Sequence, residues 1–196
     1  MKTAFSLLGM GLSMAATVIY IIGVFRGRGR PERITWLLWT VLGIIYLLAA
    51  VRTGGNVIYT CATFVGPLII LLLSLKWGVG GRSTLDLVSL GVAGIALVLL
   101  FFTTHPIISL ALSIFVDAIG ALLTVRKLFI DRSSEPKLNW LLSALGGGCA
   151  VAGLQNYRFE NVLFPAYIFC IGMFIFLLAK PAPPKASADR TKLERL

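Results

Sequence analysis

Seven long apolar stretches, separated by short polar connections, make up most of this chain. A transmembrane helix needs about 20 mainly apolar residues, and shorter helices suffice where protein surrounds them. The stretches therefore predict seven spans, at Ala4–Phe25, Ile34–Val51, Val57–Leu75, Leu85–Thr103, Pro106–Leu128, Leu138–Leu154 and Val162–Ala179. Charged residues are 13% of the sequence, about half the share found in soluble domains. We expect an all-α, multi-pass membrane protein.

Basic residues alternate sharply between successive connections. The connections after the first, third and fifth spans, together with the C-terminal tail, hold all but three of the 18 Lys and Arg residues. Lys2, Arg52 and Arg158 are left for the other side. The positive-inside rule then predicts an outside N-terminus and a cytoplasmic C-terminus. Because the net charge of +10 follows this topology, we do not expect a nucleic-acid partner.

The chain contains an internal repeat. A shift of 104 residues overlays the first three spans on the last three and places Trp36 on Trp140. Since three spans reverse the direction of the chain, a single linker span lets the second copy run parallel to the first. We therefore expect a three-one-three layout. Its parts are a first bundle at 1–81, a linker helix at 82–104, a second bundle at 105–180 and a disordered cytoplasmic tail at 181–196.

The first span ends in a basic connection that leads into Arg30–Trp36, RPERITW. With this stretch, the three-one-three layout, the outside N-terminus and an acid in the fifth span, the chain resembles the PQ-loop/SWEET superfamily of seven-span transporters. It is most similar to uncharacterised bacterial relatives in that superfamily. The resemblance implies transport of a small polar solute across a bacterial inner membrane. The Pro-Gln pair that names the superfamily is absent, because its places read Tyr20–Gly23 and Leu123–Arg126. The gating residues of the superfamily are therefore not transferred to this chain.

Asp117 is the only acid deep inside a long apolar stretch. Ser109, Ser113 and Thr124 share one helical face with it. An ionised carboxylate at mid-membrane costs at least about 3 kcal/mol, so this face should point toward a bundle interior or a wet cavity. We expect Asp117 to couple transport to protons or to bind a cation. The alternative is a protonated or serine-bonded acid that holds helices together.

Further polar residues extend this predicted pathway. Asn56 and Asn161 occupy equivalent positions near the outer ends of the third and seventh spans. Two such amides could bind a neutral polar solute, as the paired asparagine of sugar-transporting relatives implies, or they could simply cap helices. The predicted substrate or proton pathway consists of Asp117, Ser113, Thr124, Ser13, Tyr20, Asn56 and Asn161.

Two prolines and two tryptophans mark further points in the spans. Pro67 and Pro165 each remove a backbone hydrogen bond inside a span and act either as hinges or as static bends. Trp36 and Trp140 begin their spans at the cytoplasmic side, where tryptophan anchors to lipid headgroups. No catalytic motif or metal-ligand spacing is evident, so we predict neither an enzyme nor a cofactor or metal site.

These observations favour a small-solute transporter that works by alternating access between two triple-helix halves, with proton coupling through Asp117. The alternative is a non-transporting membrane scaffold or regulator, whose basic cytoplasmic loops bind anionic lipid or a partner. The sequence leaves open the solute, the coupling ion and whether copies of the chain form a homo-oligomer.

Overall fold

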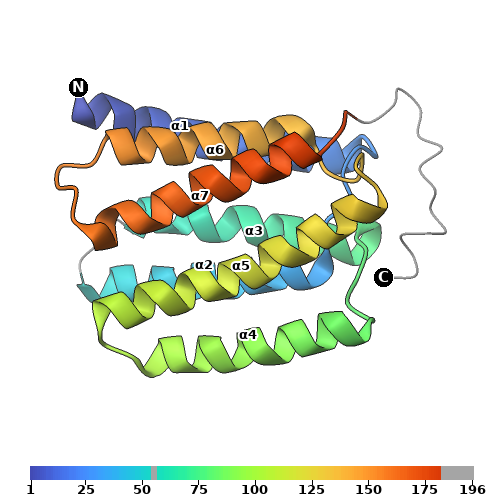
Figure 1. The fold of residues 1–196 in the computed structure, drawn as a ribbon, viewed down its shortest axis with the longest axis horizontal. Coiled ribbons are helices and arrows are strands. Elements are labelled where there is room, and N and C mark those ends of the chain that lie inside the picture. Colours follow the sequence, from blue (N-terminus) through green and yellow to red (C-terminus); the bar gives the residue numbers. More distant parts are fainter. Residues whose placement is uncertain (54–56, 182–196) are drawn as a thin grey trace. The chain divides into compact units, whose positions relative to one another are not determined.

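The computed structural model describes residues 1–53 and 57–181, with side chains described outside 49–50 and 52–63. Over these residues the chain forms seven α-helices (Figure 1). They are α1 (Lys2–Phe25), α2 (Arg33–Thr53), α3 (Val57–Trp77), α4 (Thr84–Phe102), α5 (Pro106–Ile130), α6 (Lys137–Ala152) and α7 (Phe159–Leu178). The seven predicted helical stretches are confirmed, with ends that differ by a few residues.

Four of these helices, α1, α4, α5 and α7, are long and apolar enough to cross a membrane. The described apolar parts of α2 and α3 are shorter, at Arg33–Leu48 and Phe64–Trp77, and α6 has 16 residues. The chain is therefore compatible with a membrane protein. Seven membrane crossings and their orientation stay a prediction.

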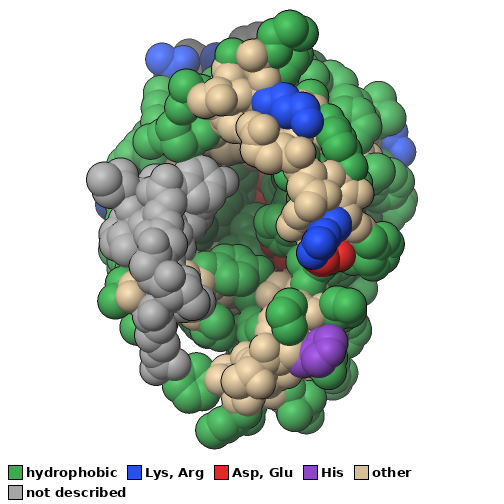
Figure 2. Space-filling view, turned by 90° about the vertical axis from the view of Figure 1, so that its left-hand side faces the viewer, with side chains coloured by type: hydrophobic (Ala, Val, Ile, Leu, Met, Phe, Trp, Pro, Cys, Tyr) green, Lys and Arg blue, Asp and Glu red, His purple; other side chains and the backbone are tan. Residues whose placement is uncertain are grey.

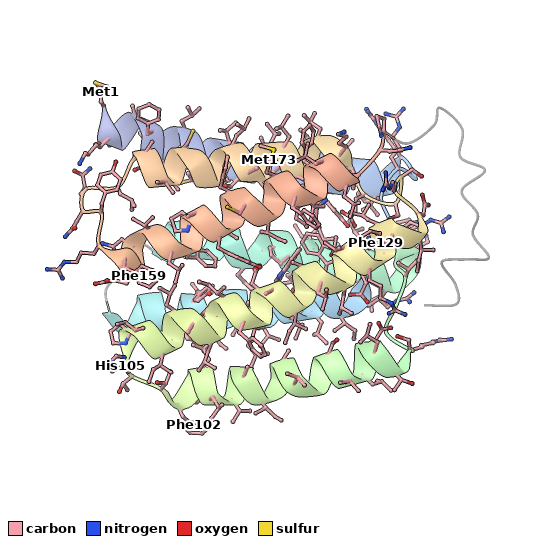
Figure 3. The ribbon with its side chains drawn as sticks, in the orientation of Figure 1. Met1, Phe102, His105, Phe129, Phe159 and Met173 are labelled. Carbon is pink, nitrogen blue, oxygen red and sulfur yellow. The ribbon has the colours of Figure 1, made fainter. Side chains whose placement is uncertain are left out.

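The outer sides of these helices carry large apolar side chains. Ile95 on α4 is 66% exposed, and Phe102 and Phe129, marked in Figure 3, are 77% and 69% exposed. Hydrophobic side chains also dominate the face shown in Figure 2. Extensive apolar surface is rare on soluble monomers and suits contact with lipid or with other protein.

The helices form two compact units. Unit 1 comprises residues 1–29 and the described part of 132–186, and in it α6 packs against both α1 and α7 (Figure 1). Glycines let these helices approach closely. A Cβ on Gly9 would lie 2.9 Å from the carbonyl oxygen of Gly146, and one on Gly147 would lie 2.8 Å from that of Pro165.

Unit 2 comprises residues 30–131 apart from 54–56, and in it α2 packs against α3, α4 and α5. Its core is built from buried aliphatic side chains of α2, α4 and α5, among them Leu38, Ala96 and Val116. The segment before α2 pairs with the segment after α3, because the Val79 N–H donates to the Pro31 carbonyl at 2.9 Å.

The two units share one plan, and it differs from the predicted bundles. A shift of 104 residues relates α1, α6 and α7 of unit 1 to α5, α2 and α3 of unit 2, and in each unit the second of these helices is central. Where unit 1 has Gly23 packed against Pro136, the equivalent positions of unit 2 hold Lys127 and Glu32, and Lys127 lies within the electrostatic reach of Glu32. The repeat therefore recurs with its first helices exchanged: α1 packs on α6, and α5 packs on α2. The grouping of 1–81 as one bundle is not confirmed.

Side-chain size favours the observed pairing of α5 with α2. On α2, Trp39 faces Gly120 of α5, where an added Cβ would lie 3.0 Å from the indole nitrogen of Trp39. The position on α1 that corresponds to Gly120 is Ala16, whose methyl group would be crowded against Trp39. On α6 the smaller Ser143 stands in the place of Trp39, so α6 accepts Ala16 more easily than α2 does.

Candidate functional site

A polar cluster lies where α5 meets α2 in unit 2. Ser113 on α5 is 3% exposed, and its hydroxyl donates to the Ser109 carbonyl at 2.7 Å. The Tyr46 side chain from α2 lies close to Ser113 and within the electrostatic reach of Asp117. Asp117 itself is partly buried. We call Tyr46, Ser113 and Asp117 the α5 cluster.

The opposite side of α5 is apolar and open. Phe115 and Leu122 are 48% and 58% exposed, whereas Ser113 and Val116 on the α2 side are buried. An acid on the protein-facing side of an apolar helix is the arrangement that a membrane span requires. Tyr46 was not among the predicted pathway residues, because α2 shows no polar stripe that would single it out.

Thr124 lies further along α5, in a closed contact between helices. It is 2% exposed, and its hydroxyl is 3.5 Å from that of Thr35 on α2. Thr35 in turn donates to the Gly120 carbonyl at 2.7 Å. Thr124 therefore joins α5 to α2 within packed protein.

Ser13 and Tyr20 belong to unit 1. The Ser13 hydroxyl donates to the Gly9 carbonyl of its own helix at 3.0 Å. Tyr20 is fully buried and donates to Oε1 of Glu135 at 3.0 Å, while the Trp140 Nε1–H donates to Oε2 at 2.8 Å. Tyr20, Glu135 and Trp140 form a buried network at the start of α6, which we call the Glu135 network.

The remaining predicted residues lie elsewhere. Asn161 is exposed in the first turn of α7, where its side-chain amide donates to the Asn156 carbonyl at 3.3 Å. This contact supports local stabilisation of the helix start. Asn56 lies outside the described residues. Pro67 and Pro165 lie inside α3 and α7, which continue through them, and their action as hinges stays a prediction.

The predicted anchoring of two tryptophans to lipid headgroups is wrong. Trp36 and Trp140 are each 7% exposed. The Trp36 ring packs edge-on against Trp39 with centroids 4.9 Å apart, and Trp140 is bound to Glu135. Both indoles thus lie in protein, because each begins the central helix of its unit.

Glu32 is a buried acid that was not among the predicted pathway residues. It is 3% exposed, its Oε2 accepts the Thr35 N–H at 2.6 Å, and its Oε1 meets no hydrogen-bond donor among the described residues. Burial raises the pKa of the Glu32 carboxyl, against smaller lowering effects of Thr35 and Lys127. Gly80, with φ +77°, leaves room for Oε1 of Glu32, because a Cβ there would overlap that oxygen.

One signal in the sequence could have revealed both buried glutamates. Pro31-Glu32 and Glu135-Pro136 stand at equivalent places before α2 and α6, in reversed order. Their charged neighbours suggest exposed loops, whereas each loop folds back onto its unit. The part of the chain that the structure describes holds no group of three His, Cys, Asp or Glu side chains that could bind a metal ion.

Comparison of the chain with protein-family models, with curated proteins and with solved structures finds no match.

Proposed function

We propose that this protein is a small-solute permease of a bacterial inner membrane, with Asp117 as its coupling or solute-binding carboxylate. One observation carries the proposal. Asp117 lies on a helix that is long and apolar enough to cross a membrane, on the side that packs against α2 and beside two hydroxyl groups. A carboxylate in such a place is expensive to retain and is typical of ion or solute pathways.

The chemistry of the α5 cluster limits the solute classes. A carboxylate flanked by the hydroxyls of Tyr46 and Ser113 can exchange a proton, bind a cation or accept hydrogen bonds from a polar solute. It would repel an anion unless Asp117 were protonated. We therefore favour neutral polar or cationic solutes, with proton coupling through Asp117.

The repeated three-helix plan of units 1 and 2 also favours transport. Parallel repeats are common in transporters, where one repeat moves against the other during alternating access. In this proposal Asp117 belongs to the element that α5 and α2 form, while the Glu135 network stabilises the equivalent element of unit 1. An outside N-terminus and a cytoplasmic C-terminus complete the proposed topology.

The proposal is tested with purified protein in detergent and in proteoliposomes. A thermal-shift screen at acidic and neutral pH covers sugars, amino acids, organic acids and amines, because a ligand that binds the folded state raises its unfolding midpoint. Each hit is then measured by counterflow. We expect a pH-dependent hit and flux that Asp117→Asn abolishes, while Asp131→Asn, at the end of the same helix, retains both.

A different result would favour a scaffold or regulator. That result is a folded protein with no ligand response and no flux, together with a stable partner that is lost when residues 181–196 are deleted. Flux that Asp117→Asn leaves unchanged at both pH values would retain transport and reject Asp117 as its coupling group.

A further inference from the structure

A cavity of about 580 Å³ opens in unit 1 where α1 ends and α6 begins. Its volume lies within the range typical of small-molecule sites. Ile22 from α1, Leu138 from α6 and Phe176 from α7 form apolar walls. Three cations, Arg26, Arg28 and Lys137, also line it, and we call this cavity the basic cleft.

Among the residues that the structure describes, the cations of the basic cleft have no carboxylate partner. Arg26, Arg28 and Lys137 form no salt bridge with any described residue. The Lys137 ammonium lies 4.5 Å from the centroid of the Phe176 ring, which holds it at the cleft. Glu135 is the one acid among the described residues that line the cleft, and its two oxygens already accept hydrogen bonds from Tyr20 and Trp140. The cleft is therefore suited to an anion.

The position of the cleft favours an anion that also has an apolar part. It lies at the C-terminal end of α1, one of the helices able to cross a membrane. Nitrogen-tipped side chains gather around this end of α1 (Figure 3). Ile22 and Leu138 are 40% and 52% exposed, so the apolar walls continue onto the outer surface of the unit. A phosphate beside an acyl chain has this pairing of charge and apolar surface.

We propose that the basic cleft binds an anionic phospholipid, with the headgroup phosphate held by Arg26, Arg28 and Lys137 and the start of an acyl chain lying against Ile22 and Leu138. Guanidinium groups bind phosphate oxygens in pairs, which gives the site preference for phosphate over a diffuse negative surface. The site shares no residue with the α5 cluster, and the proposal holds whether or not the protein transports a solute.

Native mass spectrometry and lipid titration of the full chain test this site. The probes are phosphatidylglycerol and phosphatidylcholine, and the variants are Arg26→Gln, Arg28→Gln and the double variant. Since each basic residue near a lipid surface contributes about 1 kcal/mol, the double variant should bind phosphatidylglycerol about 30-fold more weakly. Arg132→Gln is the matched control, because Arg132 is an exposed cation of unit 1 that does not line the cleft.

Three results would overturn the proposal. The first is equal retention of phosphatidylglycerol and phosphatidylcholine by the wild type. The second is an equal loss of binding in Arg132→Gln and Arg26→Gln, which would indicate a general basic surface. The third is displacement of phosphatidylglycerol by glycerol phosphate at similar concentration, which would indicate a site for a soluble phosphate compound. Arg26 and Arg28 are exposed, and retained helicity of their variants excludes misfolding as the cause.

Discussion

The hydroxyl of Tyr20 donates a 3.0 Å hydrogen bond to Glu135, 115 positions away in the chain, and neither side chain is more than 1% exposed. This bond joins α1 to the connection that precedes α6. Trp140 binds the second oxygen of the same carboxylate. Long-range contact between the first and sixth helices is therefore stabilised by polar groups as well as by close packing.

Tyr20→Phe should lower the free energy of unfolding by about 1–3 kcal/mol, because it removes the hydroxyl donor and leaves a buried oxygen of Glu135 without that hydrogen bond. Thermal and denaturant unfolding in detergent would measure the change. Tyr157→Phe is the control, since that hydroxyl is exposed and lies 3.5 Å from the Ala152 carbonyl. Equal stability of the two variants would show that the bond between Tyr20 and Glu135 contributes little.

Glu32→Gln should change how stability depends on pH. Burial raises the pKa of Glu32 in the folded protein above its usual value of 4.5, so the folded state holds the proton more tightly than the unfolded state. Stability of the wild type should then decline as pH rises above about 4.5 and level off above the folded-state pKa. Gln cannot ionise, so the variant should lack this decline.

Unfolding midpoints of wild type and Glu32→Gln, measured across this pH range, provide the test. The difference between them should widen in favour of the variant as pH rises. Glu160→Gln, in the first turn of α7, should give a curve parallel to that of the wild type. A parallel curve for Glu32→Gln as well would contradict a raised pKa at Glu32.

Gly9→Ala and Gly11→Ala should have opposite effects, although both glycines lie in α1. A Cβ on Gly9 would lie 2.9 Å from the Gly146 carbonyl oxygen, whereas a Cβ on Gly11 would meet nothing within 4 Å. Overpacking should cost Gly9→Ala about 1–3 kcal/mol. Gly11→Ala should be neutral or stabilising by up to about 1 kcal/mol, because alanine favours the helix. Similar unfolding midpoints for both variants would refute the α1–α6 contact.

Ser83→Ala should destabilise the start of α4 by about 1 kcal/mol. The Ser83 hydroxyl accepts the Asp86 N–H at 3.2 Å, and the Asp86 carboxylate accepts the Ser83 N–H at 3.1 Å. Arg126 of α5 donates to both side chains. Hydrogen exchange of the first turn of α4 would register the loss. Thr84→Ala, one residue later and exposed, should leave hydrogen exchange of this turn nearly unchanged. Faster exchange in Thr84→Ala but not in Ser83→Ala would reject the cap.

Much of the local structure could be predicted from the sequence. Apolar length predicted the seven helices, because a stretch of about 20 apolar residues satisfies its backbone in apolar surroundings only as a helix. Helical spacing placed Ser113 and Asp117 on one face of α5. The repeat at a shift of 104 residues also recurs in the plan of the two units. These features depend on residues close together in the chain.

The pairing of helices was decided by tertiary structure alone. Trp39 of α2 packs against Gly120 of α5, where an added Cβ would lie 3.0 Å from the indole nitrogen, so the fit of α5 on α2 depends on side chains far apart in the chain. The burial of Glu32 and Glu135 depends likewise on how their connections fold back onto each unit. Apolar periodicity determines which face of a helix is covered. Shape and hydrogen bonding between distant residues determine which helix covers it.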